Sequence, residues 1–448
     1  MDAQSLARSP GHPFYERLNA ELASHGFEGY VESLCARFYA ETMGRPGLAP
    51  GVYFRLLMIG YFEKIDSERG IAWRCADSLS LRDFAGIDLD EAPPDHSTIS
   101  RTRRLIDVET HEAIFTWVLT ALAKADLVKG KTVGIDATTL EANAALRSIV
   151  RRDTGESYKE FLNDLASASG IETPTREQLA KLDRKRPNKG SNDDWQNPHD
   201  PDAQITKMKD GRTHLAHKDE HAVDLDTGAV LAVTLHGGAV GDCASLPETL
   251  GAAEGNLDEI AQDEAAAEHL HEHPAQEVVA DKGYHSNDTL LDLETDGHRT
   301  YVSEPNRGRR KWTNKADAKR AVHANRQRIR GERGKRLLRK RGELLERPFQ
   351  HYLDGGGMRR THLRGHGNIL KRLLIHVAGF NLGLLMRKLV GRGTPRGLHS
   401  APANLLSAIR SPWIAAQRSM ASWVGRQIAN YARPTPIGLL ATQTARAA

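Results

Sequence analysis

Cysteine is scarce in this sequence, which has only Cys35, Cys75 and Cys243 among 448 residues. The three are far apart and lack the paired spacing of a metal site, so a disulfide framework and a structural zinc are both excluded. Runs of about eighteen apolar residues are also lacking, as is the apolar N-terminal stretch of a secretory signal. We therefore expect a cytoplasmic protein that does not associate with a membrane.

The composition excludes a disordered chain, because 39% of the residues are hydrophobic and 27% are charged. The length predicts at least two folded units. The net charge of +4 hides a basic tract at residues 307–341 and an acidic stretch at 254–277. A dense basic tract is suited to binding DNA phosphates, although a solvated helix face has the same composition.

Residues 1–125 are expected to form an all-helical N-terminal domain, because apolar residues recur there at intervals of three and four. One predicted helix follows the sequence PPDHS and carries Arg101, Arg103 and Arg104. Such a helix fits a DNA groove, so we predict that these arginines bind DNA. Many capped surface helices have the same pattern.

Beyond Lys131 the sequence has short β-branched runs separated by Gly and Asp. The runs on either side of residues 226–228 are expected to form a hairpin. Helical segments are expected at about 244–268, 286–296, 316–347 and 367–390. This alternation predicts an α/β fold with a mixed sheet flanked by helices, spanning residues 126–392. A polar stretch at about 147–210 interrupts it, as an inserted helical subdomain or a flexible loop. Residues 393–448 are predicted to be a peripheral C-terminal tail.

Two aspartates follow apolar strand sequences, Asp136 in VGIDATTLEA and Asp281 in EVVADKGYHS. Simpler interpretations exist for each alone: Asp136 as an ordinary strand-end acid, and Asp281 as a helix cap or a partner of Lys282. Two such acids in one predicted sheet, with a third on a later basic helix, instead favour a carboxylate site for Mg²⁺ or Mn²⁺.

The sequence resembles the DDE transposases of bacterial insertion sequences, specifically the InsH-like, insertion-sequence-five superfamily and its insertion-sequence-1182-like relatives. The resemblance extends to about residue 395 and rests on PPDHSTISRTR, GIDATTLEANAA, VVADKGYHS and GELLERPFQHYLDGGGMRRTHLRGHG. It implies a ribonuclease-H-like sheet and a catalytic triad of two aspartates and one glutamate.

Carried over residue by residue, the resemblance matches the triad's aspartates to Asp136 and Asp281. The sequence LERPF selects Glu346 as the glutamate. Glu343 is the alternative, because Arg339 fits the family's arginine position when the interval is measured from Glu343. The triad implies two bound Mg²⁺ or Mn²⁺ ions.

The resemblance also implies roles for residues near the triad. Lys282 and Tyr284 are expected to orient the DNA strand being cut. Arg359, Arg360 and Arg364 are expected to hold DNA phosphates. The simpler alternatives are pairing of the arginines with surface acids and packing of the tyrosine.

Together these features predict a DNA transposase that binds the terminal inverted repeats of an insertion sequence. It would cleave double-stranded DNA at the element ends and join them to target DNA, as a homodimer or larger assembly on DNA. Two alternatives remain open: a ribonuclease-H-fold nuclease, and a catalytically silent DNA-binding protein derived from a transposase.

Overall fold

The computed structural model describes residues 11–40, 47–186, 190–208, 210–306, 308 and 310–399. Contacts divide the chain into two units, residues 1–395 and 396–448. Most of the predicted C-terminal tail therefore lies outside the described residues.

The N-terminal part of the first unit is helical, as its periodicity predicts. Its α-helices are α1 (Pro13–Ser24), α2 (Phe27–Cys35), α3 (Pro50–Glu63), α4 (Glu68–Ala76), α5 (Leu79–Ala85), α6 (His96–Leu105) and α7 (Val108–Lys124). Serine or aspartate side chains cap the first turns of α4 to α7. The three cysteines are unpaired, in agreement with the sequence prediction.

A mixed sheet forms the centre of the unit, and its six strands are β1 (Thr132–Glu141), β4 (Gln204–Lys207), β5 (Thr213–Asp224), β6 (Val230–Gly237), β7 (Glu277–Ala280) and β8 (Arg299–Val302). The strand order is β4-β5-β1-β7-β8, and β6 pairs with β5. β5 is antiparallel to β1 and β6, whereas β7 is parallel to β1 and β8. The predicted mixed α/β fold is thus confirmed.

The predicted hairpin is formed by β5 and β6. Its turn includes Gly228, whose φ of 86° is a conformation that favours glycine. The Gly228 N–H donates to the carbonyl oxygen of Asp224 at 2.7 Å, which closes the turn.

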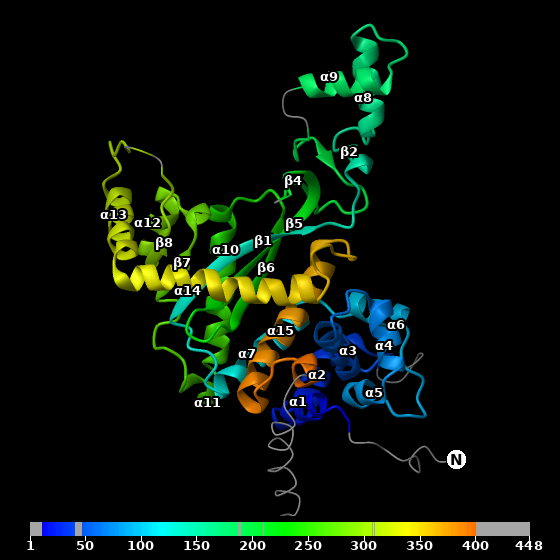
Figure 1. The fold of residues 1–448 in the computed structure, drawn as a ribbon, viewed down its shortest axis with the longest axis vertical. Helices are drawn as coiled ribbons and strands as arrows, with labels where there is room; N and C mark the ends of the chain where they lie inside the picture. Colours follow the sequence, from blue (N-terminus) through cyan, green and yellow to red (C-terminus); the bar gives the residue numbers. More distant parts are fainter. Residues whose placement is uncertain are drawn as a thin grey trace, which may run out of the picture. The chain divides into compact units, whose positions relative to one another are not determined.

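Helices cover the sheet on both faces. Those that follow β6 are α10 (Asp242–Ile260), α11 (Glu264–Ala267), α12 (Asn287–Thr295), α13 (Ala316–Arg330), α14 (Glu332–Phe349) and α15 (His366–Val390). α14 crosses the strands (Figure 1). Its Leu345 lies over Gly134 of β1, where a side chain would collide with the leucine. α10 covers the opposite face, where its Ser245 and Thr249 contact Glu220 of β5.

One long helix was predicted over residues 316–347, but two form. Gly331 separates α13 from α14 with φ −70° and ψ 158°, an extended conformation that ends the first helix. A π-helical segment, Gln350–Gly355, follows α14. The basic tract is therefore divided between two helices with different neighbours.

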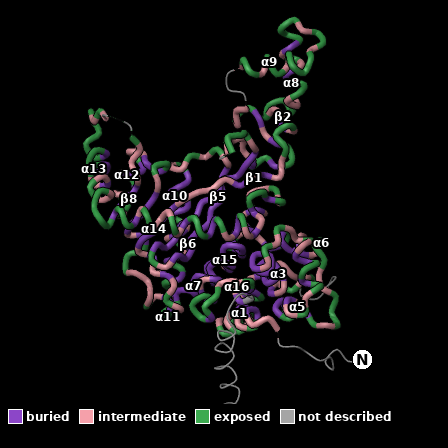
Figure 2. The backbone as a smooth tube through the Cα atoms, in the orientation of Figure 1, coloured by how far each residue is buried: buried purple, intermediate pink, exposed green. Residues whose placement is uncertain are grey.

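The N-terminal helices share a core with α15. α3 and α7 both pack on α15, and Figure 2 shows these helices as largely buried. Arg372 of α15 is 2% exposed and donates to the carbonyl oxygen of Ile65 at 2.9 Å. The N-terminal helices are thus joined to the rest of the unit by buried contacts.

Among the described helices, α15 is the one that is long and apolar enough to cross a membrane, by length and composition only. The qualifying stretch is His366–Leu398, and 89% of its most apolar window is buried inside the protein. A buried core helix has the same properties, so this observation is weak evidence for a membrane span.

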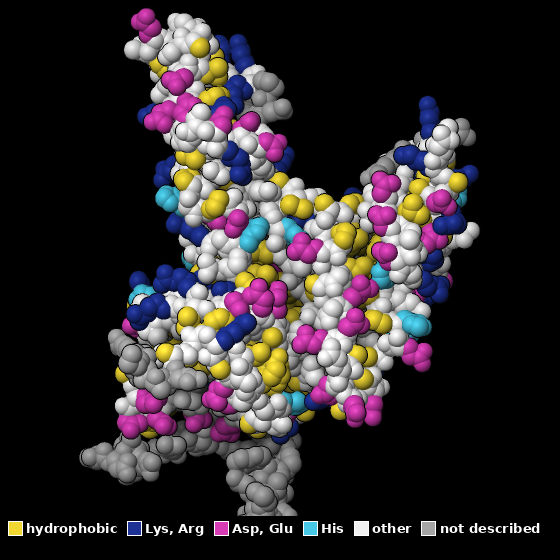
Figure 3. Space-filling model, turned by 180° about the vertical axis from the view of Figure 1, so that it is seen from behind, with side chains coloured by type: hydrophobic (Ala, Val, Ile, Leu, Met, Phe, Trp, Pro, Cys, Tyr) yellow, Lys and Arg dark blue, Asp and Glu magenta, His cyan; other side chains and the backbone are white. Residues whose placement is uncertain are grey.

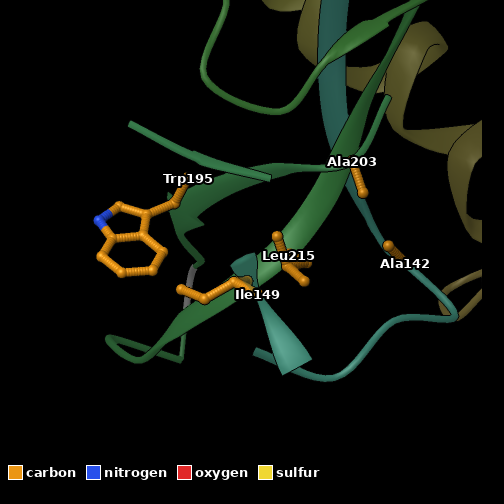
Figure 4. Packing of buried hydrophobic residues seen from close by; sticks show 5 residues of the cluster. All are labelled: Ala142, Ile149, Trp195, Ala203 and Leu215. Carbon is orange, nitrogen blue, oxygen red and sulfur yellow. The ribbon is translucent and has the colours of Figure 1, made fainter. Parts of the chain in front are cut away.

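The polar insertion contains regular structure. It has the two-stranded sheet of β2 (Val150–Arg151) and β3 (Trp195–Gln196), together with α8 (Tyr158–Ala168) and α9 (Arg176–Lys185). A small core holds it, made of Ala142, Ile149, Trp195, Ala203 and Leu215 (Figure 4). Of the two predicted forms, the inserted helical subdomain is therefore correct. The insertion also supplies β4 to the main sheet.

Candidate active site

The two predicted aspartates belong to neighbouring parallel strands: Asp136 lies within β1, and Asp281 is the first residue after β7. Gly134 of β1 is paired with Val279 of β7, and Asp136 and Asp281 each come two residues later. Neighbouring strands are about 4.8 Å apart. Because β1 and β7 are parallel, both aspartates lie towards the same end of the sheet.

Asp136 is held by a cation from α14. Its Oδ1 lies 2.7 Å from the guanidinium of Arg341, whose side chain is only 12% exposed. The same guanidinium donates to the carbonyl oxygen of Ile135 at 3.2 Å. This ion pair offsets part of the cost of placing Asp136 within a strand.

Asp281 caps a short turn. Its Oδ1 accepts a hydrogen bond from the Gly283 N–H at 2.7 Å, at the start of the 3₁₀ segment Lys282–Tyr284. Asp281 thus caps this turn, whereas the helix that follows, α12, is capped by Ser286. The cap also fixes its carboxylate at the end of β7.

The two candidate glutamates are not brought to these aspartates. Leu337, Leu345 and Phe349 form the buried side of α14, whereas Glu343 and Glu346 are exposed. Glu343 pairs with Arg347 one turn later. Among the described residues, no group of three His, Cys, Asp or Glu side chains is arranged to hold a metal ion.

Five consecutive ionisable residues of β5, His217 to His221, are buried, and the sequence analysis did not predict their burial. Alternation along the strand sends Asp219 and His221 to the α14 face, and Lys218 and Glu220 to the α10 face. His221 is the cross-strand neighbour of Asp136. The sequence feature that could have revealed them is the uninterrupted polar run KDEH within β5. In a half-buried strand, polar residues are instead expected to alternate with apolar ones.

On the α14 face the buried polar groups of β5 contact each other. His221 Nε2 lies 3.1 Å from Asp219 Oδ1, and the hydroxyl of Tyr352 donates to Asp219 and lies 3.2 Å from His221 Nε2. Burial and the neighbouring Asp219 carboxylate raise the pKa of Tyr352 well above its usual value. The tyrosine therefore remains a hydrogen-bond donor at neutral pH.

On the α10 face Glu220 accepts hydrogen bonds from three hydroxyls: Ser245 at 2.8 Å, Tyr284 at 2.7 Å and Thr249. The ammonium of Lys218 lies 3.3 Å from the same carboxylate. Burial and Glu220 raise the pKa of Tyr284. We call this set, Lys218, Glu220, Ser245, Thr249 and Tyr284, the Glu220 network.

The arginines predicted to bind DNA from α6 have different surroundings. Arg101 and Arg104 are exposed. Arg103 is 6% exposed, and its Nε donates to Glu68 of α4 at 2.7 Å. The surface of α6 therefore presents two of the three predicted cations, and the third joins α6 to α4.

The segment that carries Arg359, Arg360 and Arg364 lies along the end of β1. The N–H of Glu141 donates to the Arg359 carbonyl oxygen at 2.9 Å. Arg359 pairs with Asp354, and Arg364 donates to the Asn143 carbonyl oxygen at 3.0 Å. Arg360 and Arg364 line a hollow of about 230 Å³. Lys282 is exposed beside Asp281.

Much of the basic tract is neutralised within the fold. Arg326 forms two hydrogen bonds with Glu304, at 2.7 and 2.8 Å, and Arg333 binds the buried Glu277. Arg336 and Arg339 of α14 are exposed. Figure 3 shows acidic, basic and apolar side chains interspersed on the face opposite to that of Figure 1. Only part of the tract is therefore available to phosphates.

One known family matches part of the chain. Residues 4–105 match the family model described as a transposase domain (DUF772). This stretch includes α1 to α6 and covers less than a quarter of the chain. The match supports a transposase, and thus a DNA-acting enzyme in general. Neither a curated protein nor a solved structure matches the chain.

Proposed function

We propose that this chain is a DDE transposase that cuts double-stranded DNA at the ends of an insertion sequence and joins them to a target. The observation that carries the proposal is that Asp136 lies in β1 and Asp281 directly follows the neighbouring parallel strand β7, in a chain whose residues 4–105 match a transposase domain. The mixed sheet, with antiparallel β6-β5-β1 and parallel β1-β7-β8, supports a ribonuclease-H-like fold.

Asp136 and Asp281 are the proposed ligands of Mg²⁺ or Mn²⁺. In phosphoryl-transfer sites Mg²⁺ is typically held by one or two carboxylates plus substrate phosphates, so two aspartates suit one such ion. When bound, the ion would stabilise developing charge on the phosphate and activate a water or 3′-hydroxyl. The second expected ion depends on the third carboxylate.

Glu346 remains our proposed third carboxylate, because the LERPF register of the family resemblance selects it, and Glu343 is the alternative. Both are exposed on α14. Either glutamate therefore requires a change in α14 before it can join the aspartates. The same change would have to release Arg341 from Asp136, because the two side chains form an ion pair.

DNA is proposed to extend from the aspartates towards the arginine segment at the end of β1. Glu141, which pairs with that segment, comes five residues after Asp136, a distance of roughly 16 Å along a strand. That length corresponds to about five nucleotides of one strand. Arg360 and Arg364 would hold phosphates there, and Lys282 would contact the strand beside Asp281.

The proposed assembly and location follow from the reaction. Two element ends have to be joined to one target, so we propose a homodimer or larger assembly on DNA in the bacterial cytoplasm. Arg101 and Arg104 are proposed to contact the terminal inverted repeats. Arg103 is left out of this contact because it is buried against Glu68.

The test uses labelled duplexes that carry the DNA flanking the gene, with Mg²⁺ and a target plasmid. Wild type should cut at the element boundary and join the 3′ end to plasmid. Asp136→Asn and Asp281→Asn should each lower cleavage by at least about 10²-fold while DNA binding persists. Full cleavage by either variant would refute the carboxylate site.

A second candidate function is a catalytically silent DNA-binding protein. The observation in its favour is that neither Glu343 nor Glu346 is gathered with the aspartates. Binding of the end duplex by wild type, without cleavage in Mg²⁺ or Mn²⁺, would select this candidate. Cleavage without joined product would instead indicate a nuclease.

A further inference from the structure

The Glu220 network has no part in the reaction proposed above, yet it is costly to bury. Glu220 is fully buried and Lys218 is 6% exposed. Removing a carboxylate and an ammonium from water costs several kcal/mol per ion unless their hydrogen bonds are replaced. Here three hydroxyls and the Lys218 ammonium surround the Glu220 carboxylate. The network is thus fully satisfied.

The network is joined to the turn that carries Asp281. Tyr284 comes three residues after Asp281, and its ring is 1% exposed. Its hydroxyl donates to Glu220 Oε1 at 2.7 Å. At the other end of the turn, Asp281 accepts from the Gly283 N–H. The segment 281–284 is therefore fixed at both ends, by its own cap and by Glu220.

A second connection reaches the same turn through α10. Lys218 Nζ donates to Asp242 Oδ1 at 2.7 Å, at the first turn of α10. A Cβ at Gly283 would collide with Asp242 Oδ2 and would lie 3.0 Å from Asp281 Oδ1. The carboxylates of Asp242 and Asp281 thus both approach the position that a Cβ of residue 283 would take, so a side chain has no room there.

We propose that Glu220 is a positioning residue that holds Asp281 in place through Tyr284, and that Lys218 supports Glu220 by binding it and Asp242. The catalytic consequence rests on the proposed function, whereas the positioning itself does not. β5 thereby supports the site from both faces, because its neighbouring residue His221 lies across from Asp136 on the α14 face.

The chain offers a matched control. Tyr301 of β8 is 2% exposed, and its hydroxyl donates to the buried Glu277 at 3.2 Å. Tyr301→Phe and Tyr284→Phe therefore each remove one hydrogen bond from a buried glutamate in the same sheet. Only the second lies next to Asp281. Glu220→Gln instead changes the group that accepts the hydrogen bond from the Tyr284 hydroxyl.

The experiment combines amide hydrogen exchange on metal-free protein with Mn²⁺ titration of the same samples. In Tyr284→Phe and Glu220→Gln, exchange in the peptide covering residues 281–286 should be at least about 10-fold faster than in wild type. Mn²⁺ affinity should fall about 10- to 100-fold. Tyr301→Phe should leave both readouts unchanged.

Exchange at 281–286 that is equal in Tyr284→Phe and Tyr301→Phe would overturn the proposal. Tyr284→Phe removes only one hydroxyl, so it remains informative even where Glu220→Gln does not fold. Faster exchange in a protein that neither binds Mn²⁺ nor cleaves DNA would support the positioning role and refute the proposed function. The two conclusions can therefore fail separately.

Discussion

The two faces of the central sheet handle buried charge differently. On the α10 face one carboxylate, Glu220, accepts hydrogen bonds from three hydroxyls and lies beside a lysine. On the α14 face the charged groups form separate clusters, Arg341 with Asp136, His221 with Asp219, and Arg333 with Glu277. Glu277 also accepts hydrogen bonds from Thr132 and Tyr301. The α10 face therefore gathers its buried charge around one carboxylate, whereas the α14 face distributes it over three sites.

The largest expected loss of unfolding free energy comes from the α10 face. Lys218→Met removes the ammonium from Glu220 and Asp242 and leaves a buried carboxylate without its cation. Breaking a buried pair in this way costs about 3–5 kcal/mol. Urea denaturation followed by circular dichroism measures the change. A loss below about 1 kcal/mol would mean that the hydroxyls alone stabilise Glu220.

Tyr352→Phe tests the α14 face with a smaller expected effect. The variant removes the hydroxyl that donates to Asp219 and contacts His221. Leaving a buried acceptor unsatisfied costs about 1–3 kcal/mol. The same urea measurement applies, with Tyr39→Phe as control because its hydroxyl is only partly buried. Equal losses in the two variants would contradict the role of the buried pair.

Arg333→Met tests a pair on the α14 face through its pH dependence. Burial opposes ionisation of Glu277, but hydrogen bonds from Arg333 and Thr132 lower its pKa overall. A lowered pKa stabilises the fold above the usual glutamate value of about 4.3, and this contribution is lost as the pH falls through the folded-state pKa. We expect Arg333→Met to cost about 1–2 kcal/mol at pH 7, because Arg333 is 46% exposed.

The measurement for Arg333→Met is urea denaturation between pH 7 and pH 3. The difference from wild type should shrink as the pH falls below the usual glutamate pKa. Lys335→Met is a suitable control, since its partner Glu332 is highly exposed. A difference that stays constant with pH would show that the loss comes from packing rather than from the Glu277 carboxylate.

The smallest effect on stability, under about 0.5 kcal/mol, is expected for Glu343→Gln and Glu346→Gln, because both side chains are exposed. Their effects on DNA cleavage should differ. Glu346→Gln should abolish cleavage and Glu343→Gln should preserve it, as measured on the end duplex in Mg²⁺. The reverse result would assign the third carboxylate to Glu343. Normal cleavage by both would remove α14 from the site.

The sequence predicted the two strands that lead to the candidate aspartates. The apolar runs before Asp136 and Asp281 do form β1 and β7, which are neighbouring and parallel. The exposure of the glutamates could also have been predicted from the sequence. Leu337, Leu345 and Phe349 recur at helical intervals and define the buried side of α14. Choosing the glutamate by family register alone overlooked that pattern.

Other features required the tertiary structure. The KDEH run of β5 gives no apolar alternation, so its burial depends on partners from α10, the turn after β7 and the π-helical segment. The division of residues 316–349 at Gly331 was likewise missed, because a single glycine within a helical pattern is often tolerated. Such choices are decided by packing between segments distant in the sequence.

The small core of the insertion has a consequence for how this protein can be re-engineered. Ala142 and Leu215 belong both to that core and to the segments entering and leaving the main sheet, and β4 pairs with the first half of β5. Deleting residues 147–210 would therefore remove residues that pack against or pair with the main sheet. A shortened protein would have to keep β4 and rejoin the chain before Gln204, or it would leave an unpaired sheet edge prone to aggregation.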